Sequence, residues 1–368
     1  MNNDAAIPAH LHAAASAAGT DLARHLAADA RTAAVTAVTN KMAALGIKHV
    51  LYQFVSVTGR VMGKAAPAAH WPAIAARGVQ LWYGAVADVC ADRQGNYIGY
   101  GANASELVAI PDPETFCQLP WNPRVARVFC TLFRNREDQE DAGAFLTSDC
   151  RGNLRRIHTD FQQRHGMHLR VGCEPEMMWL KRGEDGKFAG GTTRPFAYHI
   201  DQFEQLFPVI EKVTDYAQAM GLDMIQGDHE DAPGQLELNI WFDDALRNAD
   251  RLTTYRQICA QVAREFNLIA TFMTKPFMGV SANGCHHNVS LWRGGVDEVN
   301  PIGRDGELPG SDEVFTYRKG GSNEFLRPDG DWMPPAIGLH CIGGMMEHLP
   351  ALTALGSSTV NSYRRLAD

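Results

Sequence analysis

The stretch Val171-Gly-Cys-Glu-Pro-Glu-Met-Met-Trp-Leu180 carries the most fold information in this sequence. Its apolar residues predict a strand over residues 169–180. Strand side chains alternate between two faces, so Glu174 and Glu176 share one face, and Cys173, Met177 and Trp179 fill the other. Acids within an apolar strand are costly to bury unless a positive group meets them. The pattern predicts a sheet with an acidic face, and a half-exposed strand with a solvated polar side is the alternative.

Two later segments supply side chains of the same kind. His229-Glu-Asp-Ala-Pro-Gly-Gln-Leu-Glu-Leu238 predicts two strands joined by a Pro-Gly turn and carries Glu230 and Glu237. His286 follows in a Gly/Asn/Ser-rich loop that leads into a strand. Carboxylates grouped in this way favour Mg²⁺ or Mn²⁺ over zinc, and two such ions would indicate phosphate chemistry. Solvated hairpin acids and a structural histidine pair remain the alternative.

The composition is that of an ordinary globular protein. The chain has 368 residues, 45% hydrophobic and 21% charged, which suits roughly two domains of about 150 residues each. A net charge of -8 argues against an extended nucleic-acid surface, and no apolar run reaches the roughly 20 residues of a membrane span. The eight cysteines form no Cys-x-x-Cys pair, which predicts reduced thiols in a cytoplasmic protein.

The succession of elements predicts an α+β protein in three parts. Residues 1–33 form an Ala-rich extension without the apolar core of a secretory signal. Residues 34–140 form a small strand-dominated domain, in which a helix ends at Gly46 and a long loop covers residues 81–112. Residues 141–368 form the larger domain, with a solvent-facing helix expected at 149–164. Further helices are expected at 200–220, 251–266 and 335–355, and strands at 169–180 and 223–242.

Any nucleotide site must rest on metals and arginines, because the sequence lacks a Gly-x-x-x-x-Gly-Lys-Ser/Thr loop. The stretch Gly99-Tyr-Gly-Ala-Asn-Ala104 resembles a dinucleotide fingerprint, but no buried strand is expected before it. Phe242, Ser290 and Trp292 are candidates for a pocket around a nucleotide base. Core packing is the alternative for Trp292.

Five motifs resemble those of glutamine synthetases and occur in that family's order. They are Gly172-Cys-Glu-Pro-Glu, Asp228-His-Glu-Asp-Ala-Pro-Gly-Gln-Leu-Glu, Ala270-Thr-Phe-Met-Thr-Lys-Pro-Phe, Asn283-Gly-Cys-His-His and Ser358-Thr-Val-Asn-Ser-Tyr-Arg-Arg-Leu366. The resemblance runs from about residue 45 to the end. It is greatest to the branch with the third-type bacterial enzymes and the γ-glutamylmethylamide synthetases.

The resemblance implies a β-grasp first domain and a larger catalytic domain whose antiparallel sheet is flanked by helices. It implies a homo-oligomer of stacked hexameric rings. It also implies ATP-dependent ligation of a small amine to the γ-carboxyl of L-glutamate through γ-glutamyl phosphate, with no nucleic acid and no membrane involved.

The same resemblance assigns roles to individual residues. Glu176, Glu230 and Glu237 would hold one Mg²⁺ or Mn²⁺, and Glu174 and His286 the other. The remaining assignments are Phe242 and Ser290 beside ATP, Asn283 and Gly284 around the α-groups of glutamate, and Arg365 as the catalytic arginine at the glutamyl phosphate.

The segment Trp82-Tyr-Gly-Ala-Val86 departs from the ammonia-using enzymes. There, an aspartate followed by Gly-Ser-Ser reaches the neighbouring subunit's site and helps to bind and deprotonate ammonium. Here Tyr83 takes the best-matching position and apolar residues replace the serines. Loss of a charge weakens ammonium capture, which favours an organic alkyl or aryl amine, although Asp88 or Asp92 could supply the charge.

The chain ends at Asp368, where the family continues into a flap, further arginines and a third ligand for the second metal. We expect this sequence to be part of a longer enzyme, and a truncated, inactive polypeptide is the alternative. The alternatives are an ammonia-using glutamine synthetase, a catalytically impaired member with a role in assembly, and a ligase with another carboxylate acceptor.

Overall fold

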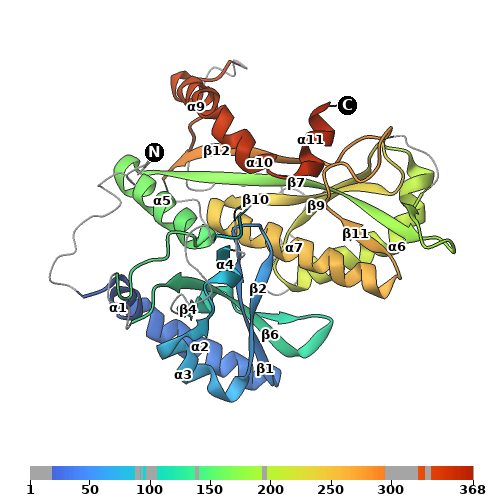
Figure 1. Cartoon of the computed structure of the whole chain (residues 1–368). Coiled ribbons are helices and arrows are strands. Elements are labelled where there is room, and N and C mark those ends of the chain that lie inside the picture. Colours follow the sequence, from blue (N-terminus) through green and yellow to red (C-terminus); the bar gives the residue numbers. More distant parts are fainter. Residues whose placement is uncertain are drawn as a thin grey trace. The chain divides into compact units, whose positions relative to one another are not determined.

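The computed structural model describes residues 19–87, 92, 94–96, 106–136, 141–192, 197–294, 322–327 and 333–367. The chain divides into two compact units that meet between Arg156 and Ile157 (Figure 1). Each unit combines helices with a sheet, so the predicted mixture of helix and strand is confirmed, whereas the β-grasp topology stays a prediction. No helix in the described ranges is long and apolar enough to cross a membrane.

The first unit contains a six-stranded sheet. Its spatial order is β2 (Val61–Pro67), β1 (His49–Val55), β6 (Asn122–Phe133), β4 (Leu107–Pro111) and β3 (Val79–Leu81), and β5 (Cys117–Leu119) also pairs with β6. Strands β1 and β6 run parallel and the other pairs antiparallel. The helical segments are α1 (Asp21–Leu26), α2 (Asp29–Leu45), η2 (Ala68–His70), α3 (Trp71–Arg77), α4 (Gly84–Ala87) and η3 (Pro113–Thr115).

The core of this unit lies between the sheet and helices α2 and α3. Met42 of α2 and Trp71 of α3 pack with Tyr52 and Phe54 of β1, all nearly inaccessible to solvent. Gly46 ends α2 with a φ of 65°, a left-handed conformation that costs glycine little. The predicted end of this helix is therefore confirmed.

The loop predicted over residues 81–112 is wrong at both ends. Strand β3 ends at Leu81, α4 follows, and all five residues of β4 are buried. A short apolar run that is buried on both faces has no alternation to reveal it. Pro111 is the last residue of the strand and lies beyond residues 107–109, which pair with β3.

The second unit contains a seven-stranded sheet in which every pair is antiparallel. The spatial order is β13 (Ser322–Asn323), β12 (Cys285–Arg293), β7 (Met167–Arg182), β10 (Gln235–Asp244) and β9 (Met224–His229), and β8 (Phe188–Gly190) and β11 (Ile269–Thr271) also pair with β7. The predicted strand over residues 169–180 lies within β7, the longest strand of this sheet.

Helices cover the two faces of this sheet unequally. Figure 1 shows α6 (Ile200–Ala219) and α7 (Ala245–Glu265) on one side and α10 (Leu349–Gly356) and α11 (Val360–Ala367) on the other. On α7, Asn248 donates hydrogen bonds to the Val171 carbonyl and the Cys173 sulfur. The face of β7 that carries Cys173 is therefore covered, and the glutamates point to the opposite face.

Two expected helices differ from the prediction. The long helix predicted over 335–355 is two helices, α9 (Ala336–Glu347) and α10, because Pro350 lies in the first turn of α10 and cannot continue α9. Helix α5 (Cys150–His165) was expected to face solvent. It carries Arg151 and His158, each 7% exposed, because both side chains form ion pairs with aspartates.

Candidate functional site

Three neighbouring strands bring carboxylates into one row. Glu237 on β10 lies in register with Glu176 on β7 and with Asp228 on β9. One step along the sheet, Glu174 on β7 lies in register with His286 on β12. Like charges directly opposite each other destabilise a sheet. The row therefore does not stabilise the sheet, and its arrangement fits the binding of a positive ligand.

Part of the row has the spacing of a metal site. Ligand atoms of Glu174, Glu237 and His286 all lie within 4.8 Å of one another. Nδ1 of His286 is 3.3 Å from a carboxylate oxygen of Glu174, and Glu237 is only 9% exposed. Two carboxylates and one imidazole fit a hard divalent cation such as Mg²⁺ or Mn²⁺.

Three carboxylates at the row, those of Asp228, Glu230 and Glu237, resist ionisation. Burial, followed by the charges of Asp228 and Glu176, raises the pKa of Glu230 to about 7. Burial also raises the pKa values of Asp228 and Glu237. In the described part of the chain, Asp228, Glu230 and Glu237 form no ion pair, and the adjacent Glu174 pairs only with His286. A bound cation would remove this penalty.

Two amides orient the glutamates of β7. Gln235 Nε2 lies 2.9 Å from Oε2 of Glu176, and Asn288 Nδ2 lies 2.8 Å from Oε1 of Glu174. The other oxygen of Glu176 lies beside Gly284, where an added Cβ would be 2.8 Å from it. A side chain at position 284 would therefore displace this carboxylate.

The paired histidines have different environments. His286 lies with the acids, whereas His287 lies in register with Cys173 on the opposite face, and its Nε2 is 3.6 Å from the Cys285 sulfur. His229 is fully buried, and its ring nitrogens contact the Glu230 carbonyl and the Thr192 hydroxyl. A structural role thus fits His287 and His229, and His286 is the histidine available to a cation.

The candidate nucleotide residues lie together. The rings of Phe242 and Trp292 stack with centroids 6.0 Å apart, and Trp292 Nε1 donates to the Ser290 hydroxyl at 2.9 Å. Trp292 is 7% exposed, which fits the packing alternative for that residue. Contact of Phe242 and Ser290 with a nucleotide stays a prediction.

Hydrogen bonds to three different segments hold the predicted substrate loop. Asn283 is 4% exposed, and its amide bonds the side chain of Gln235 and the carbonyl of Met273. Arg365 on α11 donates to the Asn283 carbonyl. The Asn283 side chain therefore fixes the loop, and Gly284 and the exposed Arg365 are the predicted substrate residues that remain accessible.

The predicted amine residues belong to the first unit. Tyr83 is half-buried and packs against that unit's core. The Asp92 carboxylate accepts hydrogen bonds from Gln94 and Asn96 within a local turn. Asp88 lies outside the described residues.

Four residues near the row were missed by the sequence reasoning. Asp228, Gln235 and Asn288 each lie two positions from a predicted residue on the same strand or turn, so the alternation of strand side chains could have identified them. Tyr198 has no such signal. Its φ is 62° and its side chain is exposed, and the charges of Asp228 and then Glu230 raise its pKa.

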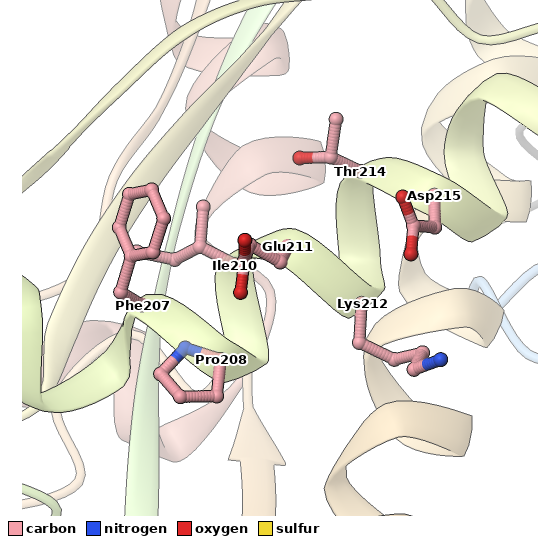
Figure 2. Close-up of a pocket in the computed structure, with 7 residues that line it drawn as sticks. All are labelled: Phe207, Pro208, Ile210, Glu211, Lys212, Thr214 and Asp215. Atoms are coloured by element: carbon pink, nitrogen blue, oxygen red, sulfur yellow. The ribbon is translucent and has the colours of Figure 1, made fainter.

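A surface depression elsewhere in this unit has no part in the row. It has a volume of about 460 Å³ and is lined only by α6, from Phe207 to Asp215. Figure 2 shows these side chains on successive turns of the one helix. No predicted site residue lies there.

Comparisons with known proteins agree with this geometry. The sequence matches the family described as "Glutamine synthetase, catalytic domain" over residues 147–313 and 314–368. It is 30% identical to the glutamine synthetase of Rhizobium meliloti (strain 1021), over 76% of this chain and 59% of that protein. It is 29% identical to the glutamate–methylamine ligase of Methyloversatilis universalis, over 87% of this chain and 64% of that protein.

Solved structures show the same relationship. A structure described as a GmaS/ADP complex has a TM-score of 0.71 and 28% identity, over 90% of this chain and 67% of that one. A structure described as a novel glutamine synthase homolog has a TM-score of 0.65 at 19% identity, over 87% and 67%, and shows the fold alone. This chain spans about three fifths of the length of the curated relatives.

Proposed function

The chain belongs to the glutamine synthetase family, and from this premise we propose that it ligates an amine to the γ-carboxyl of L-glutamate at the expense of ATP. The row of Asp228, Glu237 and Glu176, with Glu174 and His286 beside it, carries the proposal. Such a set attracts divalent cations, and divalent cations neutralise the phosphate oxygens of ATP.

We assign the residues as follows. Glu176, Glu230 and Glu237 hold one divalent cation, and Glu174 and His286 hold a second. Glu237 lies between the two, because one of its oxygens is within 4.8 Å of ligand atoms of both Glu174 and His286. The ATP base lies against Phe242 and Ser290, glutamate meets the Asn283–Gly284 loop, and Arg365 faces the transferred phosphoryl group.

The reaction has two chemical steps. The γ-carboxylate of glutamate attacks the γ-phosphorus of ATP, so that ADP leaves and γ-glutamyl phosphate forms. The amine nitrogen then attacks the acyl carbon, phosphate leaves and the nitrogen loses one proton. Because the first step needs little covalent help from the protein, positioning by Glu176 and charge stabilisation by Arg365 are the main contributions.

An alkyl or aryl amine is the proposed nucleophile. Tyr83, with Ala85 and Val86, supplies apolar bulk where the ammonia-using relatives carry an aspartate and serines. The similarity to a glutamate–methylamine ligase points the same way. Tyr198 adds an exposed aromatic ring next to the acids, and such a ring can attract an alkylammonium group.

Steady-state phosphate release with ATP, Mg²⁺, glutamate and a panel of ammonium, methylamine and aryl amines tests this proposal. We expect kcat/KM for an organic amine to exceed that for ammonium by at least about tenfold, which equals roughly 1.4 kcal/mol. Preference for ammonium would contradict the amine assignment. Absence of turnover with every amine would favour the impaired member with a role in assembly.

We also propose a homo-oligomer of stacked hexameric rings in the cytoplasm. Light scattering coupled to gel filtration of the native protein tests the assembly, and a monomer at working concentration would contradict it.

A further inference from the structure

One buried glutamine contacts both a proposed cation ligand and the proposed glutamate-binding loop. Gln235 is 1% exposed and begins strand β10, two positions before Glu237. A buried amide must satisfy all of its polar atoms, because an unpaired one costs as much as a lost hydrogen bond. The partners of Gln235 therefore show what it organises.

The Gln235 side chain has one fixed orientation. Its Oε1 accepts a hydrogen bond from the Ala232 backbone N–H at 3.0 Å. This donor requires the oxygen on that side, so the NH₂ group must point toward Glu176. The assignment of oxygen and nitrogen in this amide thus follows from the bonding pattern.

The NH₂ group serves three acceptors with two hydrogens. Nε2 lies 2.9 Å from Oε2 of Glu176, 3.0 Å from the Ala282 carbonyl and 2.9 Å from Oδ1 of Asn283. Glu176 is a proposed cation ligand, and residues 282–284 form the proposed glutamate loop. One side chain therefore fixes the carboxylate and the loop at once.

The backbone of Gln235 extends this network to a third element. Its carbonyl accepts from the Glu230 N–H at 2.9 Å, so the turn that carries Glu230 is held by the same residue. On the other side, the Glu176 N–H donates to the Gly284 carbonyl at 3.1 Å. The two proposed ligands Glu176 and Glu230 thus share one support.

We propose that Gln235 is a positioning residue that couples the cation carboxylates to the glutamate-binding loop. The proposal rests on the proposed function and adds to it. Gln235 holds Oε2 of Glu176 while Oε1 of the same carboxylate lies beside Gly284. It also holds the Ala282 carbonyl and the Asn283 side chain, which precede Gly284 in the loop. Binding of a cation at Glu176 therefore orders the loop that receives glutamate.

Gln235→Met in the full chain tests this, because methionine keeps the length and burial and removes the NH₂ group. Loss of a side chain that orients a metal ligand typically weakens metal binding by roughly 10–100-fold. We expect a decrease of that size in Mn²⁺ affinity by calorimetry without substrates. We also expect KM for glutamate to rise at saturating Mn²⁺ while KM for ATP stays within about twofold.

Gln202→Met is the matched control, since Gln202 is a 2% exposed glutamine on α6 of the same unit. Its Mn²⁺ affinity should equal that of the wild type. If Gln235→Met does not fold, Gln235→Asn replaces it, because the shorter amide cannot span from β10 to Oε2 of Glu176. Unchanged Mn²⁺ affinity in a folded variant at position 235 overturns the proposal.

A double-variant comparison separates positioning from general stability. In a Glu176→Gln background, Gln235→Met should cause no further loss of Mn²⁺ affinity, whereas an equal additional loss would overturn action through Glu176. A wild-type protein that binds no Mn²⁺ would overturn the proposed function and this inference together. A wild type that binds Mn²⁺ as tightly as Gln235→Met overturns this inference alone.

Discussion

Asp112 in the first unit and the acidic row in the second unit show opposite responses of a carboxylate to burial. In the first unit, burial would raise the pKa of Asp112, but the guanidiniums of Arg151 and Arg155 outweigh it and hold the pKa below its ordinary value. In the second unit, burial and neighbouring acids raise the pKa of Glu230 to about 7. No arginine or lysine within the described ranges forms an ion pair with the row.

This difference separates scaffold from site. Asp112 has its countercharges within the chain, so it needs no cation from solution. It holds the first turns of α5, which carry Arg151 and Arg155 and belong to the same unit. The row of Asp228, Glu237 and Glu176, together with the adjacent Glu174, Glu230 and His286, brings five carboxylates and one imidazole together. Among the described residues no arginine or lysine pairs with them, which is unfavourable until a cation binds. A protein that keeps such a cluster gives up stability for binding.

The largest expected effect is on turnover. Glu176→Ala should lower the rate of ATP cleavage by about 10³-fold or more, because a misplaced cation no longer stabilises the charge of the transferred phosphoryl group. Phosphate release with saturating ATP, Mg²⁺, glutamate and amine measures this. Glu211→Ala, on the exposed side of α6, should keep wild-type activity, and appreciable turnover by Glu176→Ala would refute the site assignment.

The cluster of Asp112 with Arg151 and Arg155 should affect the stability of the fold rather than activity. Asp112→Asn removes the carboxylate that pairs with Arg151 and Arg155, and the Arg151 side chain is only 5% exposed. The variant should lower the free energy of unfolding by about 3 kcal/mol. Urea denaturation measures this. Asp185→Asn breaks an exposed pair with Lys187 and should have no measurable effect. A loss of Mn²⁺ affinity in folded Asp112→Asn would contradict the assignment of Asp112 to stability alone.

The smallest expected effect is a gain. The pKa of Glu230 lies above the 4.5 of an unperturbed glutamate, so the folded protein binds this proton more tightly than the unfolded chain. Its contribution to stability is complete below about pH 4.5 and is lost as the pH rises through about 7. Glu230→Gln should therefore stabilise the metal-free protein at pH 8, by about 1 kcal/mol after solvent screening.

Thermal unfolding with chelator at pH 5 and pH 8 measures this gain. The variant should melt higher than the wild type at pH 8 and near it at pH 5. Added Mn²⁺ should reverse the order at pH 8, because the wild type alone gains the ligand. Equal melting of both proteins at pH 8 without metal would show that Glu230 is not strained.

The sequence predicted most of the second unit because its signals are periodic. Alternation placed Glu174 and Glu176 on one face of β7, and the Pro-Gly turn fixed the two strands that bear Glu230 and Glu237. It could not predict β4, because LVAIP is buried on both sides and shows no period. The role of Gln235 could not be predicted either. Its three acceptors come from segments far apart in the sequence, and only the fold brings them to its amide.

The break between α9 and α10 was missed for a different reason. The predicted helix continued through Leu349-Pro350 because apolar composition outweighed one proline. The two helices also expose apolar side chains such as Leu355, which is 80% accessible. Their apolar composition is therefore not explained by burial within this unit.

The central claim is that the row is a divalent-cation site, and a calorimetric titration of Mn²⁺ into the metal-free wild-type protein tests it most directly. A Glu174→Gln, Glu237→Gln double variant and Asp112→Asn serve as comparisons. We predict saturable binding in the wild type and in Asp112→Asn and at least a hundredfold weaker binding in the double variant, roughly 2.7 kcal/mol. Equal Mn²⁺ affinity in the wild type and the double variant, or no binding by the wild type, would contradict the account.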